Sequence, residues 1–294
     1  MFEKIDMHVH TGRYDGEGSP IEIVDRATKV SGLKGVVLLD HDMLPPYEIE
    51  NSLYNNIIDY GKSVNMVVST AVEVTAETHI ENVHVLWYNF LKNEKTCAYF
   101  KKANQNKQDA YQEMCGNLSK NGYEITYDEL QKENTIVSRL DILNNLIKKG
   151  YANSLAEAKS LLEDEKNIAY VSRNSVSQIV EMIRDNNGIA ILAHPMLICD
   201  RDRERIICEA ITAGISGFEL FYPYIKNGYG SSTDLSITYE FFNLLYKVGV
   251  FRRGNFVFTG GSDYHGNKKK EVGLGEAYIG IEQYLYYFMN GDKI

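Results

Sequence analysis

The chain has 294 residues, of which 44% are hydrophobic and 24% are charged, and its formal net charge at pH 7 is −9. This length is enough for one α/β barrel or for two ordinary domains, and the composition is that of a soluble globular protein. An acidic chain is poorly suited to binding a long phosphate backbone, so long nucleic acid is not expected as a partner, whereas a small phosphorylated substrate is compatible with it.

The sequence also predicts the cellular location of the protein. No apolar run is long enough to cross a membrane. The four cysteines form no C-x-x-C pair, and the first strand is expected to begin directly at the N-terminus, without a signal peptide. Because unpaired cysteines are typical of a reducing compartment, we expect a cytoplasmic protein.

Strand and helix patterns alternate in residues 1–92. A helix is predicted to begin at Ser19 and Pro20, since serine caps helix N-termini and proline is favoured in the first turn, and to end before Gly32. A second helix is expected over residues 45–62. The expected strands are residues 5–10, 35–40, 64–74 and 83–88.

Residues 93–167 have a different pattern. They are polar, rich in Lys, Asn, Gln and Glu, and their apolar residues recur at helical spacing. One such stripe consists of Leu140, Leu143, Leu146 and Ile147. The segment lacks the Pro, Gly and Ser bias of a linker. We therefore interpret it as a helical subdomain inserted into a larger α/β unit.

The alternation resumes in residues 168–294. Helices are expected over residues 176–184, 203–213 and 238–248, and strands over residues 188–194, 217–221 and 256–260. Repeated β-α units imply a parallel sheet. With this many units, and with polar side chains at so many strand ends, we expect the α/β class and a closed, TIM-like barrel rather than an open sheet.

Six of the seven histidines lie where an apolar, strand-like run stops, and only His79 is outside this pattern. His8 and His10 are two residues apart on a strand, so both point to the same face. Asp263 and His265 repeat this spacing at the last strand. Convergent strand ends are where barrel enzymes build their sites. The alternative reading is a hydrogen-bonded network at the strand ends without metal.

Carboxylate side chains are further candidates for the site that these histidines form. His41 lies between Asp40 and Asp42, either of which could orient its imidazole. Glu73 places a carboxylate inside an apolar strand, where it needs a cationic partner such as a metal. Glu219 is either a further polar contact near the metals or a structural residue. In all, nine residues are candidate metal ligands: His8, His10, Asp15, His41, Glu73, His84, His194, Asp263 and His265.

Nine ligands are too many for one zinc ion. Two or three divalent metals that share a bridging carboxylate would use them all, and Mn, Fe, Zn and Mg each tolerate subsets of these ligands. Clustered metals suit phosphate ester hydrolysis, because they generate hydroxide near neutral pH and neutralise charge on the phosphoryl oxygens. The sequence has no G-x-S-x-G motif and no phosphate-binding glycine-rich loop with lysine, so no separate nucleophile is indicated.

In the order of these motifs the chain resembles the polymerase and histidinol phosphatase (PHP) superfamily. The matching motifs are Asp6-Met-His8-Val-His10, Tyr14-Asp15-Gly16, Leu39-Asp40-His41-Asp42, Ala71-Val72-Glu73, Ala193-His194-Pro195 and Ser262-Asp263-Tyr264-His265. The resemblance implies a distorted (β/α)7 barrel with a trinuclear metal site, and catalytic roles for Asp263, His265 and His194. It also implies three ligand sets: His8, His10, Glu73 and Asp263; Glu73, His84 and His194; and Asp15, His41 and His265.

Within the superfamily, residues 93–167 resemble the branch of 3′,5′-nucleoside bisphosphate phosphatases and 5′→3′ exoribonucleases. The resemblance lies in Val137-Ser138-Arg139 and in Ala169-Tyr170-Val171-Ser172. It implies that Arg139 binds substrate phosphate and takes part in catalysis, which suits its planar guanidinium group. Asp141 and Met196 depart from the branch, which usually has His and Gly-Arg there. These departures concern the substrate and not the metal ligands.

The expected function is hydrolysis of a phosphate monoester or diester of a nucleotide-type substrate by metal-bound hydroxide. The substrate would be a nucleoside 3′,5′-bisphosphate or a short RNA 5′ end. Lys268, the first of three consecutive lysines, is a further candidate for phosphate binding. Two alternatives are open: a small-metabolite phosphatase of the histidinol phosphate type, and a non-catalytic PHP module that binds metal. The sequence indicates neither the oligomeric state nor the group that protonates the leaving oxygen.

Overall fold

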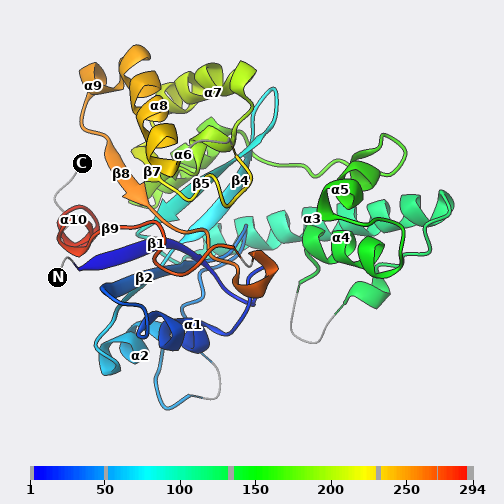
Figure 1. Ribbon diagram of the computed structural model, residues 1–294, viewed down its shortest axis with the longest axis horizontal. Helices are drawn as coiled ribbons and strands as arrows, with labels where there is room; N and C mark the ends of the chain where they lie inside the picture. The colour runs from blue at the N-terminus through cyan, green and yellow to red at the C-terminus, as the bar shows by residue number, and fades with distance from the viewer. Residues whose placement is uncertain (1–2, 50–51, 132–135, 230–232, 270, 290–294) are drawn as a thin grey trace.

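The strands of the protein form two sheets in the computed structural model, which describes residues 3–49, 52–131, 136–229, 233–269 and 271–289. The strands are β1 (Lys4–His10), β2 (Leu33–Leu39), β3 (Val67–Thr70), β4 (Val72–Glu77), β5 (Asn82–Tyr88), β6 (Ile189–Leu192), β7 (Gly217–Phe221), β8 (Val257–Gly260) and β9 (Ile279–Gly280). One sheet has the order β3-β2-β1-β9 and the other the order β4-β5-β6-β7-β8 (Figure 1). The expected α/β class is confirmed.

The two sheets join at two places. Only Ala71 separates β3 from β4, so one run of chain passes from the first sheet into the second. An isolated parallel bridge pairs His41 with Glu73 at this join, and another pairs Val9 with Tyr264, just beyond β8. The ladder of the described strands is interrupted at both joins and forms no continuous barrel. The joins nevertheless bring the ends of β1, β2, β4 and β8 to one region.

The expectation of an all-parallel arrangement is wrong for β5, which runs antiparallel to both β4 and β6. The cause is local, because only residues 78–81 connect β4 to β5, and so short a connection allows only a hairpin. The Thr78 hydroxyl and amide both bond the Glu81 carbonyl and so close this turn. As a result, His84 lies near the beginning of its strand rather than at the end.

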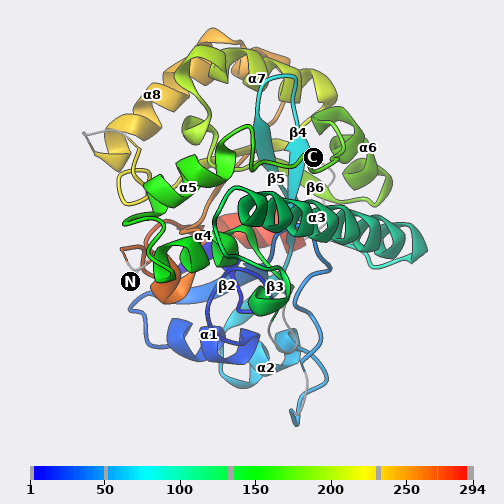
Figure 2. The same cartoon turned by 90° about the vertical axis from the view of Figure 1, so that its right-hand side faces the viewer.

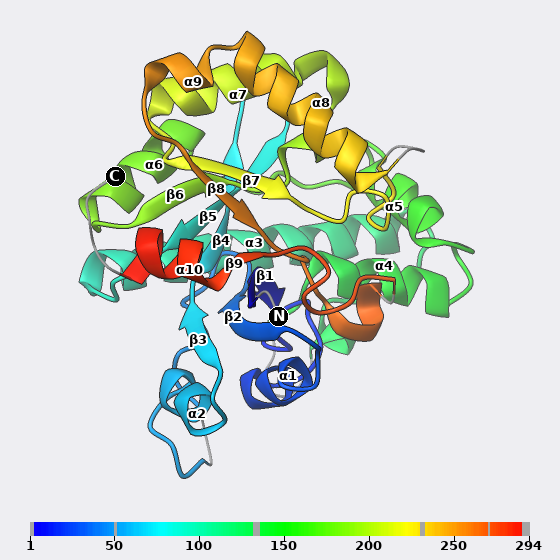
Figure 3. The same ribbon diagram turned by 60° about the vertical axis from the view of Figure 1, so that its left-hand side comes forward.

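Helices cover the outer faces of the sheets. They are α1 (Pro20–Ala27), α2 (Ile57–Ser63), α6 (Val176–Asp185), α7 (Asp200–Ala213), α8 (Asp234–Lys247), α9 (Val250–Arg253) and α10 (Ile281–Tyr284). Ser19 caps α1 and Pro20 occupies its first turn, as predicted. The helices α7 and α8 pack on the five-stranded sheet through Ile206, Phe218 and Phe241 (Figure 3).

The helix predicted for residues 45–62 begins later than expected, at Ile57. Pro45 and Pro46 explain part of the difference, because the residue before a proline is disfavoured in helical conformation. Asn56 supplies the actual cap, accepting a hydrogen bond from the Asp59 amide. Residues 50–51 of the predicted helix lie outside the described part of the chain.

Residues 93–167 form α3 (Glu94–Lys120), α4 (Arg139–Lys148) and α5 (Leu155–Glu163). From Ala110 onward their buried apolar residues make a separate hydrophobic cluster, which Ala169 and Val171 complete, whereas Phe100 of α3 packs with the five-stranded sheet. These helices extend to one side of the sheets in Figure 1, and α3 crosses in front of the strands in Figure 2. Among the described residues, no helix is both long and apolar enough to span a membrane.

Candidate metal centre

The structure brings the nine predicted ligands into one cluster. Eight of them fall into groups whose ligand atoms lie within 4.8 Å of one another. These groups are His10, Asp15, His41 and His265; His8, His10, Glu73 and Asp263; and His41, Glu73 and His84. The ninth, His194, places Nε2 at 3.1 Å from Glu73 and 3.3 Å from His84 Nδ1. The ligands therefore converge from both sheets.

Glu73 is the centre of the cluster. Its side chain is 1% exposed, and five imidazoles surround its two oxygens. Oε2 lies 3.1–3.3 Å from His8, His10 and His41. Oε1 lies 2.8 Å from His84 and 3.1 Å from His194. One carboxylate whose oxygens face two different groups of imidazoles has the geometry of a bridging ligand.

The electrostatic state of the cluster follows from these contacts. Burial raises the pKa of Glu73, but His41, His84 and His8 outweigh it and hold this pKa well below its usual value. Burial lowers the pKa of His10, yet hydrogen bonds to Asp263 and Glu73 raise it to about 9. Without metal, a proton on His10 therefore compensates part of the charge of the buried carboxylates.

Two contacts inside the cluster test whether metal fits it. His10 Nδ1 and Asp15 Oδ1 are buried and have no hydrogen-bond partner among the described residues, and they lie 3.5 Å apart. Buried polar atoms without partners are uncommon. The Nε2 atoms of His8 and His10 approach within 3.1 Å. Ligand nitrogens and oxygens lie about 2.0–2.2 Å from a zinc-sized ion, so atom pairs at these separations can share one.

Two of the candidate ligands have strained backbones. His194 has φ 29° and Asp263 has φ 54°, in the region that non-glycine residues rarely adopt. Hydrogen bonds stabilise the backbone at both residues. The His194 amide donates to Glu219, and the Asp263 amide donates to the His8 carbonyl. Strain of this kind is concentrated at functional sites.

Gly261 shows how closely β8 and β1 approach at the site. A Cβ atom at this position would lie 2.2 Å from the His8 Cβ, so a larger residue would displace one of the two strands. Glycine is therefore required here, and it sets the distance between His8 and the Asp263 loop.

A carboxylate outside the cluster orients His8. Glu219 Oε1 lies 3.0 Å from His8 Nδ1, while its other oxygen accepts the His194 amide. A carboxylate behind a histidine fixes which ring nitrogen is free for a metal. Of the two readings of Glu219, the structure thus favours the contact near the metals.

The expectation that Asp40 or Asp42 orients His41 is not met. Asp40 accepts hydrogen bonds from the Thr11 amide and hydroxyl. Asp42 accepts hydrogen bonds from the Thr75 amide and hydroxyl. Both carboxylates fix loops around the cluster rather than the His41 ring.

Asp263 has two partners that the sequence did not identify. The Lys269 ammonium and the Tyr222 hydroxyl both donate to Asp263 Oδ2, each at 2.8 Å. Lys269, rather than Lys268, is thus the lysine that contacts the cluster. The third lysine of the run, Lys270, lies outside the described residues. Binding of substrate by Lys268 stays a prediction.

A further lysine comes from α3. Lys107 is buried, and its ammonium lies 3.3 Å from the His41 carbonyl, 3.4 Å from Asp42 and 4.3 Å from the centre of the Tyr14 ring. Sequence reasoning missed it, although its spacing to the buried residues Ala110, Tyr111 and Met114 is helical. That spacing was the available signal for a lysine on the buried face.

Arg139, like Lys268, is a predicted site residue that the structure does not bring into contact with the cluster. Its guanidinium pairs with Glu163 of α5 at 2.5 Å, and the side chain is 42% exposed. Asp141 forms a capping box with Ser138 at the start of α4. Met196 is fully buried in the core. Asp141 therefore has a structural role of its own, and the phosphate contact of Arg139 stays a prediction.

Comparisons with known proteins agree with this geometry. No family model matches the chain. A 5′-3′ exoribonuclease of Haemophilus influenzae is 26% identical over 200 residues, covering 67% of this chain and 70% of that protein. A phosphoribosyl 1,2-cyclic phosphate 1,2-diphosphodiesterase of Eggerthella lenta is 22% identical over 275 residues, covering 89% and 94%.

Two solved structures share the fold. A protein from Bifidobacterium adolescentis assigned as a metal-dependent phosphoesterase superposes with a TM-score of 0.72 at 22% identity, over 95% of this chain and 93% of the other. The likeness at this identity is one of fold. An amidohydrolase from Chromobacterium violaceum, with bound sulfate and no metal, has the same TM-score and identity, over 93% and 90%.

Proposed function

We propose that the protein hydrolyses phosphate esters of a nucleotide-type substrate with the help of two or three divalent metals, Mn, Fe or Zn, with Mg tolerated. The observation that carries this proposal is the convergence of six histidines and three carboxylates around buried Glu73. Such a mixture of imidazole and carboxylate ligands suits these metals. Glu73 would bridge two of them.

We further propose that the nine ligands divide into the three sets that the family resemblance implies. The arrangement of the sheets and of the helices between them is also part of the proposal. The two joined sheets would act as one distorted (β/α)7 barrel, supported by the bridges at His41 and Val9. Residues 93–167 would be an inserted helical subdomain between barrel segments 1–92 and 168–294, supported by their own hydrophobic cluster.

Individual residues of the chain would have separate roles in orienting the ligands, attracting the phosphate and giving access to the metals. When bound, the metals supply a hydroxide nucleophile near neutral pH and stabilise charge on the phosphoryl oxygens. Glu219 fixes the His8 ring, so that Nε2 faces the cluster. Lys269 places a positive charge beside Asp263, where it can attract a phosphate. His84, with 30% of its side chain exposed, stands at the entrance of the cluster.

The names of the curated relatives support a ribose phosphate ester as substrate. The H. influenzae relative is an exoribonuclease, and the E. lenta relative is named for a cyclic phosphate of a phosphoribosyl group. Both names denote phosphate esters of ribose, which favours a nucleoside bisphosphate, a short RNA 5′ end or a cyclic ribose phosphate over histidinol phosphate. The E. lenta relative aligns with more of the chain, so the cyclic diester belongs in any substrate test.

The first experiment is an assay of the Mn-loaded protein with four substrates. These are adenosine 3′,5′-bisphosphate, a 5′-phosphorylated short RNA, phosphoribosyl 1,2-cyclic phosphate and histidinol phosphate. We expect turnover of at least one ribose ester, lost in Asp263→Ala and kept in Asp109→Ala, an exposed aspartate on α3. Turnover of histidinol phosphate alone would replace the nucleotide proposal. Bound metal with no turnover would favour the non-catalytic module.

A further inference from the structure

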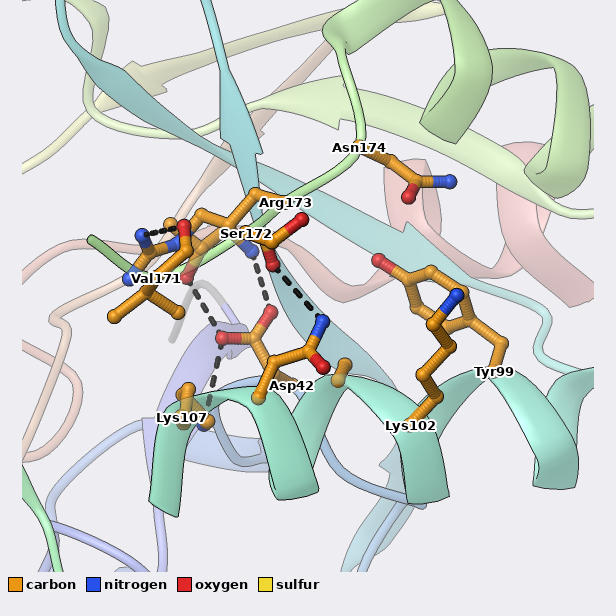
Figure 4. Close-up of a pocket in the computed structure, with 11 residues that line it drawn as sticks. Asp42, Tyr99, Lys102, Lys107, Val171, Ser172, Arg173 and Asn174 are labelled. Carbon is orange, nitrogen blue, oxygen red and sulfur yellow. Dashed lines mark hydrogen bonds and ion pairs between the residues drawn. The ribbon is translucent and has the colours of Figure 1, made fainter. Parts of the chain in front are cut away.

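A small cavity lies between α3 and residues 171–174 (Figure 4). Its volume is about 80 Å³. That is more than a water molecule needs and much less than the roughly 300–1,000 Å³ of pockets for drug-sized ligands. The cavity is therefore of a size for one compact group and not for a nucleobase with its sugar.

The lining of the cavity is predominantly cationic. Lys102, Lys107 and Arg173 contribute three positive charges, and Asp42 is the one carboxylate among the lining residues. Thr75 and Lys107 occupy the oxygens of Asp42. Within the described residues, no carboxylate pairs with Lys102 or Arg173, although Arg173 donates to the Val171 carbonyl.

Several hydrogen-bond donors in the cavity have no partner within the described part of the chain. Tyr99 and Lys102 are three residues apart on one face of α3, and Figure 4 shows both side chains reaching toward Asn174. Among the described residues, nothing bonds the Tyr99 hydroxyl, the Lys102 ammonium or the Asn174 side-chain amide. Burial raises the pKa of Tyr99, so its hydroxyl stays a donor. Arg173 Nε is also buried without a partner.

Two residues that line the cavity, Asp42 and Thr75, are direct neighbours of candidate metal ligands. Asp42 directly follows His41 in the chain, and Thr75 is paired with His84 between β4 and β5. Paired residues in antiparallel strands have Cα atoms about 4.5–5.5 Å apart. A group in the cavity and a phosphate at the metals could thus belong to one small molecule.

We propose that this cavity binds a compact phosphate group through Lys102, Tyr99 and Asn174. The assignment of this phosphate to the substrate rests on the proposed function. It is the phosphate that is not hydrolysed: the second phosphate of a nucleoside bisphosphate or the next phosphate of an RNA 5′ end. The cavity would then select substrates with two phosphates over those with one.

Binding can be tested without turnover, by calorimetric titration of the chelator-treated protein with inorganic phosphate. Lys102→Gln and Asn174→Ala should each weaken phosphate binding by about tenfold or more, as expected for loss of a hydrogen bond to a charged group. Lys101→Gln is the matched control, an exposed lysine of the same helix outside the cavity. Equal affinity in all four proteins would mean that phosphate binds elsewhere, among the histidines, and would overturn the proposal.

The link to substrate is tested by kinetics of the metal-loaded protein. For adenosine 3′,5′-bisphosphate, Lys102→Gln should raise KM about tenfold with little change in kcat. For adenosine 5′-monophosphate and adenosine 3′-monophosphate, both constants should stay as in the wild type. An equal loss of kcat/KM on all three substrates would refute the assignment of the cavity to the second phosphate of the substrate. If the wild type hydrolyses no phosphate ester, the proposed function fails, and the phosphate titration alone decides the cavity.

Discussion

The Lys107 ammonium lies 3.4 Å from a carboxylate oxygen of Asp42, the residue that directly follows the candidate ligand His41. The helix α3, which lies outside the two sheets, therefore contacts the loop after β2. Asp42 has φ 51°, and its amide donates to the Glu73 carbonyl. Both Lys107 and Asp42 are buried. The helices of residues 93–167 therefore take part in the geometry of the metal centre and are more than an appended unit.

Lys107→Met should destabilise the protein and weaken its metal site. Removing one partner of a buried ion pair leaves the other charge uncompensated, which costs roughly 3–5 kcal/mol. We expect a loss of this order in the free energy of unfolding in urea, together with reduced metal content. Lys101→Met, at an exposed position of α3, should change stability by no more than about 0.5 kcal/mol.

The pair itself can be isolated with a second substitution. Asp42→Asn removes the charge that Lys107 compensates, so Lys107→Met should cost less in the Asp42→Asn background than in the wild type. Strictly additive effects would show that the two residues are not coupled. In that case the role assigned to Lys107 would be wrong.

Glu219→Gln should reduce metal affinity by about 10–100-fold, as is typical for a carboxylate behind a ligating histidine. The substitution keeps the shape of the side chain but removes the charge that fixes the His8 ring. Competition with a metal chelator measures the change. Glu209→Gln is a suitable control, because Glu209 contacts His79 at 3.2 Å, away from the cluster. The same affinity in both variants would contradict the orienting role.

The candidate ligands were accessible from sequence because each lies in a short motif with its own signature. The spacing of His8 and His10 places both side chains on one face of a strand, whichever strands lie beside it. Glu73 was recognisable because a carboxylate within an apolar run needs a compensating charge. Such local signals hold even where the predicted element bounds are wrong.

The contacts that sequence reasoning left open or missed depend on long-range packing. Glu219 reaches His8 across 211 positions of the chain, and Lys107 reaches Asp42 from a helix in a different segment. Choosing between Lys268 and Lys269 requires the course of the loop after His265. The reversal of β5 follows from a four-residue turn without glycine or proline, which carries no strong turn signal.

Metal binding at pH 7 should release protons. The pKa of His10 in the metal-free protein is about 9, since hydrogen bonds to Asp263 and Glu73 outweigh the effect of burial. His10 is therefore protonated at pH 7, and a metal must displace that proton in order to bind. Metal affinity should rise from pH 7 to pH 9, and the calorimetric enthalpy should depend on the ionisation enthalpy of the buffer.

His79→Gln provides the control for proton release, because His79 is exposed and lies outside the cluster. This variant should release as many protons as the wild type. An enthalpy that is the same in all buffers would show that His10 is neutral before metal enters.

Lys269→Met should impair the enzyme more than Lys268→Met, although the two lysines are adjacent. Burial raises the pKa of Asp263, but Lys269, His265 and His8 outweigh it and hold this pKa well below its usual value. Without the ammonium, the pKa of Asp263 rises. A carboxyl group with a lowered pKa loses its ionised form as pH falls, so the variant should lose metal at a higher pH than the wild type on acidification.

The measurement is metal content and kcat/KM as a function of pH for Lys269→Met, Lys269→Arg and Lys268→Met. We expect about a tenfold loss of kcat/KM near pH 7 in Lys269→Met, with its acid limb displaced upward. Lys269→Arg keeps the charge and should recover most of the loss. A merely structural role would lower kcat/KM evenly at all pH values, and equal profiles for Lys269→Met and Lys268→Met would show that contact with Asp263 has no consequence for the site.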